Sequence, residues 1–429
     1  MPSLRNARPA FAGSEATFEF ARLLICIGGN GLVLQKSGER AGSAADLIQM
    51  LSKEAALMPA TRLTTFDDWV DLFRVWQKDI GVAYPEITNY KFEAKFGPTR
   101  SNEVEFGAYK GRPKWERVVQ IPDQRMRDAL LNLIVYQGDT EFASVEQQRR
   151  LFETAPSEHD RQSLCRVVTE EMRHGWQMCH LLMNHFGYSG RVEAQKMLER
   201  RAFDQKRLLG AFNQDVNNWL DFFVYTDFVD RDGKYQLTML SYSGFAPLAQ
   251  SMIPMLKEES FHLGTGQDGI KRIVKAGVIP LAIVQKYINK WVPVSLDLFG
   301  VDRSSSAHWF YVWGLKGRYD EPSATAEANL ERMNEHSREL YRQECVKLVE
   351  MINKSVPEGK TKLYVPDVKF NRFIGEHARK PYSVTGDMLS EEKYREHLKE
   401  MLPQPEDDAL VCEIQSVEKQ WISPKGAFQ

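Results

Sequence analysis

Two apolar helical stripes in this chain are interrupted by ionisable side chains. The first stripe comprises Leu164, Val167, Glu171, His174, Met178 and Leu181. Intervals of three and four residues place all of them on one helix face, and because most are apolar we expect that face to be buried. A buried carboxylate and imidazole are costly unless they pair with other groups or bind a metal ion.

The second stripe repeats this arrangement near residue 260. It comprises Leu248, Met252, Met255, Glu259 and His262. Of the nine histidines in the chain, only His174 and His262 have a glutamate three residues earlier. A single Glu-x-x-His is usually a salt bridge or a surface pair, so the repetition on two apolar faces is what favours a metal site.

A further carboxylate precedes each of these pairs at nearly the same distance. Glu141 lies 30 residues before Glu171, in a helical stripe that also contains Gln137. Asp230 lies 29 residues before Glu259, on a face shared with apolar residues. Asp227, one turn earlier, is the alternative to Asp230.

The matched spacing predicts the fold. About thirty residues suffice to run from the middle of one helix, through a turn, to the middle of an antiparallel neighbour. Two such hairpins, joined by the long span from Glu171 to Asp230, form a mainly α, ferritin-like four-helix bundle with a long central connection. We expect extra flanking helices, a small irregular or β portion, and three segments: a helical or loop extension at 1–121, the helical core with the metal site at 122–357 and an irregular C-terminal extension at 358–429.

Smaller elements can also be predicted from the pattern. Residues 65–81 read as a helix capped by Thr65, with an aromatic face docked on an apolar surface. Residues 362–365 suggest a strand, and residues near 390–401 a short helix. The "DRDGK" stretch at 230–234 reads as a helix-ending turn, and "IGGNG" at 27–31 as a turn rather than a phosphate loop.

The ligand types indicate which metal the site would hold. Four carboxylates neutralise two divalent ions, which removes most of the cost of burying them. Oxygen and imidazole ligands without a thiolate suit iron or manganese, and the pattern leaves both open. Glu170 and Glu258 are expected to face solvent or to contact the ligands from outside. A purely structural reading, with the six polar groups paired among themselves, predicts no metal.

Composition narrows the class of protein. The chain has 429 residues, a net charge of −2 and a pI of about 6.5, so it lacks the basic balance of a nucleic-acid-binding protein. The apolar run near residues 18–35 is too interrupted for a membrane span. The five cysteines are scattered and no Cys-x-x-Cys occurs, which favours the reducing cytoplasm.

Several longer motifs resemble one enzyme family. They are "YQGDTEFASVEQQRRL", "EEMRHGWQM", "LERRAFDQKRLLGAFN", "DRDGKYQL", "VQKYINKWVPVSLDLFG" and "GLKGRYDE". Over roughly residues 104–320 the chain is similar to the oxygenase components of benzoyl-coenzyme A 2,3-epoxidases, which are di-iron monooxygenases of the ferritin-like superfamily. The family's iron-ligand pattern falls on Glu141, Glu171, His174, Asp230, Glu259 and His262.

The resemblance implies an activity and its requirements. The six ligands would hold two iron ions that activate O₂ and insert one oxygen atom into an aromatic acyl-CoA thioester, by 2,3-epoxidation of benzoyl-CoA. A separate flavin and iron–sulfur reductase would supply electrons from NADPH, since this chain carries no flavin or iron–sulfur motif. We expect Gln137, Phe142 and Trp176 to line the substrate pocket.

Two departures from the family pattern motivate alternatives. Phe142 stands where the family usually has a proline, and Phe261 stands where it usually has a histidine. The first alternative is a di-iron oxygenase of the same family acting on a different acyl-CoA. The second is a non-catalytic ferritin-like protein that binds iron, although the chain is more than twice as long as a bare four-helix bundle.

Overall fold

The computed structural model describes residues 61–302, 304–323, 328–418 and 420–425. The turn expected at 27–31 lies outside these residues. All of these described residues belong to one compact unit. The proposed division of the chain into three segments stays a prediction.

Four long helices carry the ionisable stripes. They are α5 (Gln124–Gln148), α6 (Glu158–His185), α8 (Trp219–Ser241) and α9 (Ala246–Ala276). Side chains cap three of them, because Asp123, Ser157 and Asn218 each accept a hydrogen bond from a backbone N–H of the first turn. The fourth has proline in its first turn and ends at Gly277, whose φ of 71° suits glycine.

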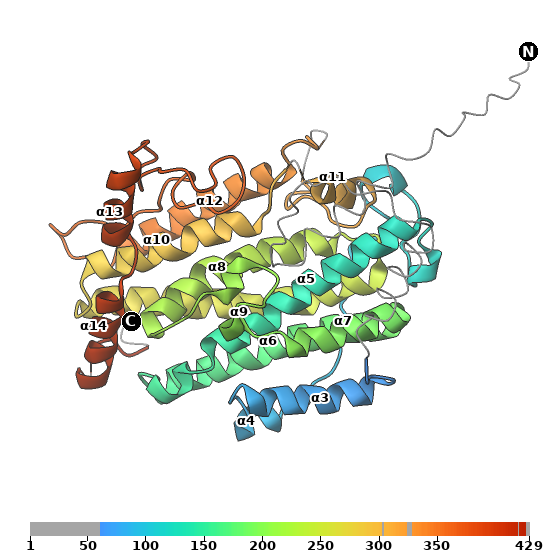
Figure 1. The fold of residues 1–429 in the computed structure, drawn as a ribbon, viewed down its shortest axis with the longest axis horizontal. Coiled ribbons are helices and arrows are strands. Elements are labelled where there is room, and N and C mark those ends of the chain that lie inside the picture. Colours follow the sequence, from blue (N-terminus) through green and yellow to red (C-terminus); the bar gives the residue numbers. More distant parts are fainter. Residues whose placement is uncertain (1–60, 303, 324–327, 419, 426–429) are drawn as a thin grey trace, which may run out of the picture. The chain divides into compact units, whose positions relative to one another are not determined.

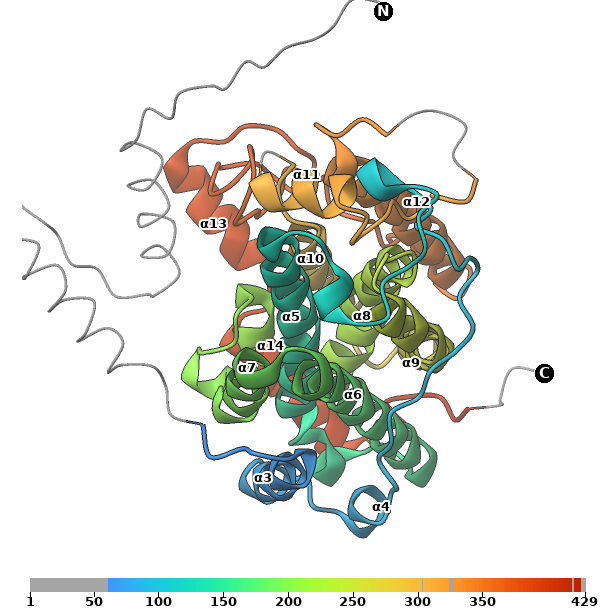
Figure 2. The same cartoon turned by 90° about the vertical axis from the view of Figure 1, so that its right-hand side faces the viewer.

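The four helices form two hairpins, as the spacing predicted. Helix α5 pairs with α6, and α8 pairs with α9 (Figures 1 and 2). The connection between the hairpins is long and contains α7 (Gly187–Glu199), which lies along α5 and α6. The mainly α, ferritin-like bundle with a long central connection is therefore confirmed.

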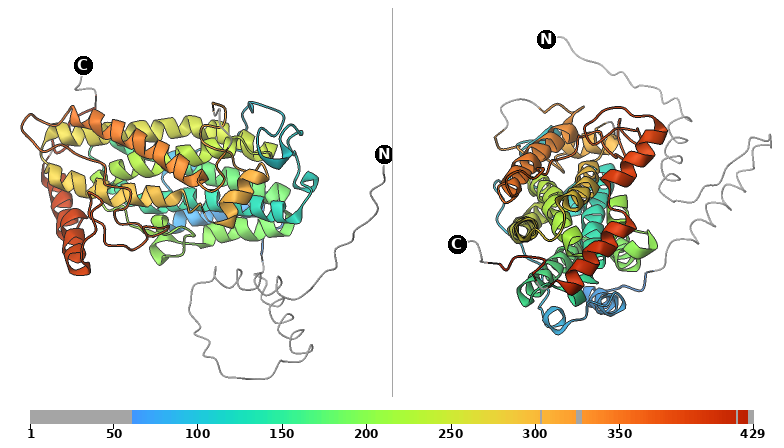
Figure 3. Two further views of the ribbon diagram at one scale, coloured as in Figure 1. Left: turned by 90° about the horizontal axis from the view of Figure 1, so that it is seen from above. Right: turned by 90° about the vertical axis from the view of Figure 1, so that its left-hand side faces the viewer.

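Further helices cover the bundle. On one side lie α3 (Phe66–Asp79) and α4 (Pro85–Thr88), and on the other lie α10 (Leu281–Leu298), α11 (Ser305–Val312) and α12 (Met333–Asn353) (Figure 2). Helices α13 (Glu391–Met401) and α14 (Pro405–Val417) lie at one end of the bundle (Figure 3). Within the described ranges, no helix combines the length and apolar character that a membrane crossing requires.

The capped aromatic helix predicted at 65–81 is confirmed. In α3 the side chain of Thr65 accepts from the backbone N–H of Asp68, and the carboxylate of Asp68 accepts from the backbone N–H of Thr65 at 2.7 Å. Trp69, Phe73 and Trp76 are buried against the bundle. The indole N–H of Trp69 donates to the carbonyl of Ala194 on α7 at 3.0 Å, which fixes α3 on the bundle.

Two local predictions were wrong. Residues 230–234 form no helix-ending turn, because α8 continues to Ser241 and buries Tyr235 and Leu237 beyond them. Packing of these apolar side chains overrides the weak helix preference of Gly233. Residues 362–365 form no strand, and the described residues contain only three isolated β-bridges.

Candidate metal centre

Six ionisable side chains from the four bundle helices meet in the interior of the bundle. They form two clusters, and within each cluster the potential ligand atoms lie within 4.8 Å of one another. The first cluster comprises Glu141, His174 and Glu259; the second comprises Glu171, Asp230 and His262. Each of the six side chains belongs to a residue with an exposed fraction of 7% or less. The residues singled out by spacing are therefore brought together.

The clusters interleave the two hairpins. Glu141 and His174 of the first hairpin are completed by Glu259 of the second. Asp230 and His262 of the second hairpin are completed by Glu171 of the first in the same way. Each Glu-x-x-His pair is thus divided between the clusters, so neither hairpin contains a complete cluster by itself.

Glu170 and Glu258 orient the two histidines. Nε2 of His174 donates to Glu258 Oε2 at 2.9 Å, and Nε2 of His262 donates to Glu170 Oε2 at 3.1 Å. A carboxylate only accepts, so each Nε2 carries a proton, and Nδ1 is the ring nitrogen that faces the carboxylates of the cluster. Carboxylates that orient metal-binding histidines in this way are common around metal sites. Both residues therefore contact the site from outside, one of the two roles expected for them.

The two orienting carboxylates have different cationic partners. Glu258 is paired with Arg173, which is fully buried, and Nζ of Lys95 lies 3.4 Å from its Oε1. Glu170 is paired with Arg166, whose side chain is 53% exposed and whose guanidinium lies over the ring of Phe261. The signal for these contacts was present in the sequence as a second glutamate before each Glu-x-x-His.

The electrostatics of the clusters favour bound cations. Burial, and then the negative charge of Glu141, raise the pKa of Glu171 well above its ordinary value. Burial, and then the charge of Glu259, do the same to the pKa of Asp230. Burial alone would lower the pKa of His262, but the charge of Glu259 raises it to about 10. Metal ions would take the place of these retained protons.

Three buried atoms of the clusters point to the same conclusion. Asp230 Oδ2, Glu259 Oε2 and His262 Nδ1 have no hydrogen-bond partner among the described residues. Buried polar atoms are rarely left unsatisfied unless an ion or a functional group completes them. The set of four carboxylates and two imidazoles is also the one used by di-iron and di-manganese carboxylate bundles. The residues present therefore fit two iron ions.

Asp227, the alternative ligand, lies elsewhere. Its Oδ1 accepts from Nη2 of Arg231 at 2.6 Å, and it belongs to neither cluster. Arg231 also reaches Glu344 on α12 at 2.6 Å, so this pair ties α8 to the covering helix. The geometry therefore favours Asp230.

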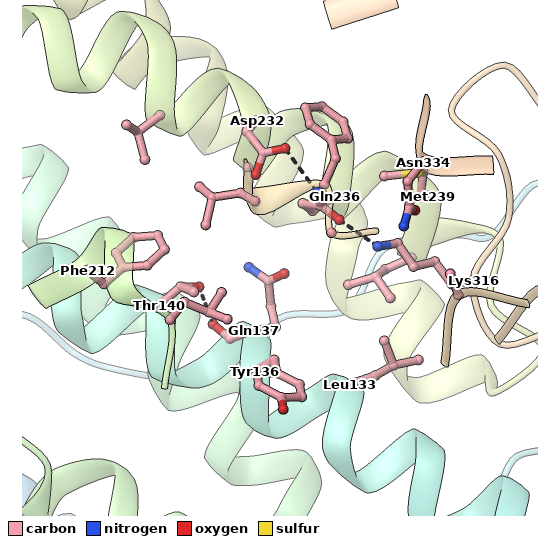
Figure 4. Close-up of a pocket in the computed structure, with 18 of the residues that line it drawn as sticks. Leu133, Tyr136, Gln137, Thr140, Phe212, Asp232, Gln236, Met239, Lys316 and Asn334 are labelled. Atoms are coloured by element: carbon pink, nitrogen blue, oxygen red, sulfur yellow. Dashed lines mark hydrogen bonds between the residues drawn. The ribbon is translucent and has the colours of Figure 1, made fainter. Parts of the chain in front are cut away.

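A cavity of about 440 Å³ extends from the clusters. Four of the cluster carboxylates line it, namely Glu141, Glu171, Asp230 and Glu259. Tyr136 and Ile374, both exposed to solvent, line it as well, so the cavity opens to the outside. Gln137 lines it (Figure 4). Its Nε2 donates to Glu141 Oε1 at 2.6 Å.

The motifs that carry the family resemblance converge on this cavity. Five of these motifs each contribute a residue to its wall. Thr140 lies on α5 in the first motif quoted, and Gln236 lies on α8. The other three come from the segment before α8 (Phe212), the end of α10 (Phe299) and the loop after α11 (Lys316). These segments are far apart in the sequence. The wall of the cavity is therefore built by the fold as a whole rather than by any one element.

Phe142 and Trp176 do not line the cavity, which corrects the expectation for both. Each lies in an aromatic cluster between α3 and the bundle, where Trp176 contacts Trp69 at a ring-centroid distance of 5.2 Å. Consecutive helix residues point about 100° apart, so closeness to a ligand in sequence does not place a side chain in the cavity. Phe142 instead packs on Gly175, where an added Cβ would lie only 2.6 Å from its ring.

Sequence reasoning missed several polar residues of the cavity. Among them are Tyr225, Asp232, Gln236 and Lys316. Asp232, Gln236 and Lys316 lie inside the quoted "DRDGKYQL" and "GLKGRYDE" motifs, which was the available signal. The hydroxyl of Tyr225 is buried without a hydrogen-bond partner among the described residues, and nothing in the sequence marked it.

Comparison with known proteins places these features in a family. The chain is 42% identical over 260 residues to benzoyl-CoA oxygenase component B of Aromatoleum evansii, covering 56% of this chain and 54% of that protein. It is 23% identical over 253 residues to one of the subunits of 1,2-phenylacetyl-CoA epoxidase from Escherichia coli K12, covering 58% of this chain and 74% of that protein. The chain thus spans about half the length of the first of these relatives.

A family profile covers the whole of the candidate metal centre. Residues 118–377 match the profile described as phenylacetic acid catabolic protein. The matched region begins before α5 and extends beyond α12, so it includes all six cluster residues and most of the cavity wall. With more than half of the chain matched, the protein belongs to the phenylacetic acid catabolic protein family.

Proposed function

We propose that this protein is the oxygenase component of a di-iron monooxygenase that converts benzoyl-CoA to its 2,3-epoxide. One atom of O₂ enters the ring and the other leaves as water. The reaction consumes two electrons and two protons, with the electrons passing from NADPH through a separate flavin and iron–sulfur reductase. The observation that carries the proposal is the opening of two buried carboxylate–histidine clusters into one cavity.

The comparisons support the substrate class. The relative with 42% identity is named as a benzoyl-CoA oxygenase component, and the more distant relative is named as an epoxidase of another aromatic acyl-CoA. Both names describe parts of multicomponent systems, which supports a separate partner. We place the reaction in the cytoplasm, in keeping with four free cysteines among the described residues.

The chain's own residues prepare the site for this chemistry. Bound iron would supply the activation of O₂, which no amino-acid side chain provides. Glu170 and Glu258 hold the two imidazole rings with Nδ1 directed to the clusters, and Gln137 holds the carboxylate of Glu141. Apolar wall residues such as Leu133 and Phe212 exclude water from the reacting ring.

The alternative of a different acyl-CoA substrate rested on Phe142 and Phe261. Neither residue is among those that line the cavity, since Phe142 packs on Gly175 and Phe261 lies under Arg166. The two departures from the family pattern therefore leave the cavity wall unchanged. Benzoyl-CoA remains the substrate that we propose.

A single turnover with labelled oxygen tests the proposal. The protein is loaded with ferrous iron without air, mixed with benzoyl-CoA and exposed to isotopically labelled O₂. The thioester product is then weighed by mass spectrometry. We expect one labelled oxygen atom in the product and two irons per chain, and Glu171→Ala should abolish the product. Glu199→Ala, which alters an exposed acid on α7, is the matched control.

Other outcomes of this experiment separate the alternatives. Two bound irons with O₂ consumption but no labelled thioester would reject benzoyl-CoA, and a panel of acyl-CoA esters would then identify the substrate. Iron uptake far beyond two per chain would indicate storage. Failure to bind iron at all would favour a purely structural role for the six polar groups.

A further inference from the structure

Two sequence motifs that the metal centre does not use meet in the cavity wall. Asp232 and Gln236 lie one turn apart on α8, and Lys316 comes from the loop that follows α11. Nε2 of Gln236 donates to Asp232 Oδ1 at 2.9 Å, and Nζ of Lys316 donates to Gln236 Oε1 at 2.6 Å (Figure 4). All three line the cavity.

The ammonium group of Lys316 has donors to spare. It carries three N–H groups, and Gln236 Oε1 is its one hydrogen-bond acceptor among the described residues. Burial lowers the pKa of Lys316 to about 8, and the nearby Asp232 partly offsets that effect. A cation held in this way by a neutral amide is free to donate to a molecule in the cavity.

The surroundings of Lys316 favour a neutral acceptor over an anion. The carboxyl group of Asp232 already lies beyond Gln236, and burial raises its pKa to about 7, so a second acid or a phosphate placed there would add to a carboxyl that is already costly to ionise. Most of the adjacent wall is apolar, including Met239, Phe299 and Phe310. A single polar group in an apolar wall fixes the orientation of a ligand.

The position of this group along the cavity matches an aromatic thioester. Gln236 lies six residues beyond Asp230 on α8, which is about 9 Å along the helix. The clusters and the Gln236–Lys316 pair therefore line the same cavity at two neighbouring levels of α8. A ring placed at the clusters therefore brings its carbonyl oxygen toward the end of the Lys316 side chain.

We propose that Lys316, positioned by Gln236, donates a hydrogen bond to the thioester carbonyl oxygen of the acyl-CoA substrate and so orients the ring toward the metal clusters. This inference rests on the proposed function, because it assumes an aromatic acyl-CoA as the ligand. It assigns substrate orientation to a residue outside the metal centre. No covalent or redox step is involved.

Binding of two ligands tests the inference without turnover. The ferrous protein is titrated by calorimetry, without O₂, with benzoyl-CoA and with S-benzyl-CoA, a thioether that lacks the carbonyl oxygen. Lys316→Met removes the donor while keeping the apolar stem. We expect its Kd for benzoyl-CoA to rise roughly tenfold or more, as for a lost hydrogen bond to a charged donor, while its Kd for S-benzyl-CoA changes by less than about twofold.

Two further variants keep the test decisive. Lys234→Met alters a lysine on α8 that pairs with Glu344 and does not line the cavity, so both affinities should stay unchanged. Lys316→Arg keeps a cationic donor and should recover most of the affinity for benzoyl-CoA. Thermal unfolding shows whether Lys316→Met is folded. If it is not, the affinity of Lys316→Arg for benzoyl-CoA still tests the inference.

The outcomes distinguish this inference from the proposed function. Equal weakening of both ligands in Lys316→Met would overturn the carbonyl contact, as would unchanged binding of benzoyl-CoA. In both cases tight binding by the wild-type protein would leave the proposed substrate standing. A wild-type protein that binds neither ligand would instead reject the acyl-CoA substrate, and the inference with it.

Discussion

The hairpin of α5 and α6 and the hairpin of α8 and α9 supply nearly the same ionisable groups, yet they are held differently. Each provides a carboxylate, a Glu-x-x-His pair and a glutamate that orients the histidine of the other hairpin. The charge that fixes Glu258 is the fully buried Arg173, whereas Glu170 depends on the exposed Arg166. Repetition in sequence therefore does not produce equivalent environments.

The packing of the two hairpins differs as well. Within α8 and α9 the backbones approach closely, since a Cβ at Gly266 would lie 2.5 Å from the backbone nitrogen of Asp227. Within α5 and α6 the corresponding close approach is between Gly175 and the ring of Phe142. A ring can shift and a backbone cannot, so we infer that the second hairpin is the less adaptable of the two.

The largest expected effect comes from removing Glu171 or Glu259, the glutamates with which each hairpin completes the cluster of the other. Glu171→Ala and Glu259→Ala should each lower turnover by more than roughly 100-fold, beyond the range typical of groups that only orient ligands. Iron content after gel filtration should fall below two per chain in both. Full iron content in either variant would contradict the interleaved assignment.

The cationic partners should differ strongly in their effect on stability. Arg173→Met leaves the mostly buried Glu258 without its buried partner, and we expect a loss of about 3 kcal/mol or more in the free energy of unfolding. Arg166→Met removes an exposed pair and should cost less than about 1 kcal/mol. Urea unfolding of the metal-free proteins measures both, and equal losses would show that burial of the arginine does not matter.

Adding a methyl group at each close approach should destabilise the two hairpins to different extents. Gly266→Ala places Cβ against backbone and should destabilise the protein by about 3 kcal/mol, whereas Gly175→Ala should cost about 1–2 kcal/mol because the Phe142 ring can move. Phe142→Leu should restore part of the loss in Gly175→Ala but none in Gly266→Ala. Thermal unfolding of the single and double variants would reveal any departure from this pattern.

The smallest expected effect is the loss of stability at acidic pH. Burial alone would raise the pKa of Glu258, but its contacts with His174 and Arg173 lower it from 4.5 to about 2. Its contribution to stability is therefore complete above pH 4.5 and is lost as the pH falls, by about 1 kcal/mol between pH 5 and pH 3.5.

Glutamine variants isolate that contribution. In metal-free protein, Glu258→Gln should reduce the slope of unfolding free energy against pH over this range. Glu170→Gln should reduce it less, because the pKa of Glu170 is lowered by His262 and by the exposed Arg166 rather than by a buried arginine. A greater reduction in Glu170→Gln would show that Glu170, not Glu258, is the orienting glutamate that contributes more to stability.

The metal centre was predictable because it depends on helical periodicity. Residues three and four apart share a face, so the repeated Glu-x-x-His and the matched carboxylates were sufficient to predict the bundle and the six residues that meet in it. The same reasoning did not predict which way the residues close to the ligands in sequence would point. Phe142 adjoins a cluster residue in sequence, and Trp176 lies two positions from another, yet both point toward α3.

The cavity wall was less predictable because it depends on distant segments. Lys316 reaches Gln236 only because the chain returns to α8 after α11, and no local pattern encodes that return. The misassigned turn at 230–234 has a related cause. Its glycine and aspartates favour a turn locally, but buried residues further along α8, such as Leu240, keep the helix continuous.

The interleaving of the clusters also has a consequence during synthesis. Helices α5 and α6 leave the ribosome before α8 and α9, and they present Glu141 and His174 without Glu259. A nascent chain therefore has no complete cluster until residue 259 has been translated, and no second cluster until residue 262 has been translated and the second hairpin has folded against the first. Under the proposed function, iron would be captured only by chains that have finished the bundle, and incomplete products would not sequester it.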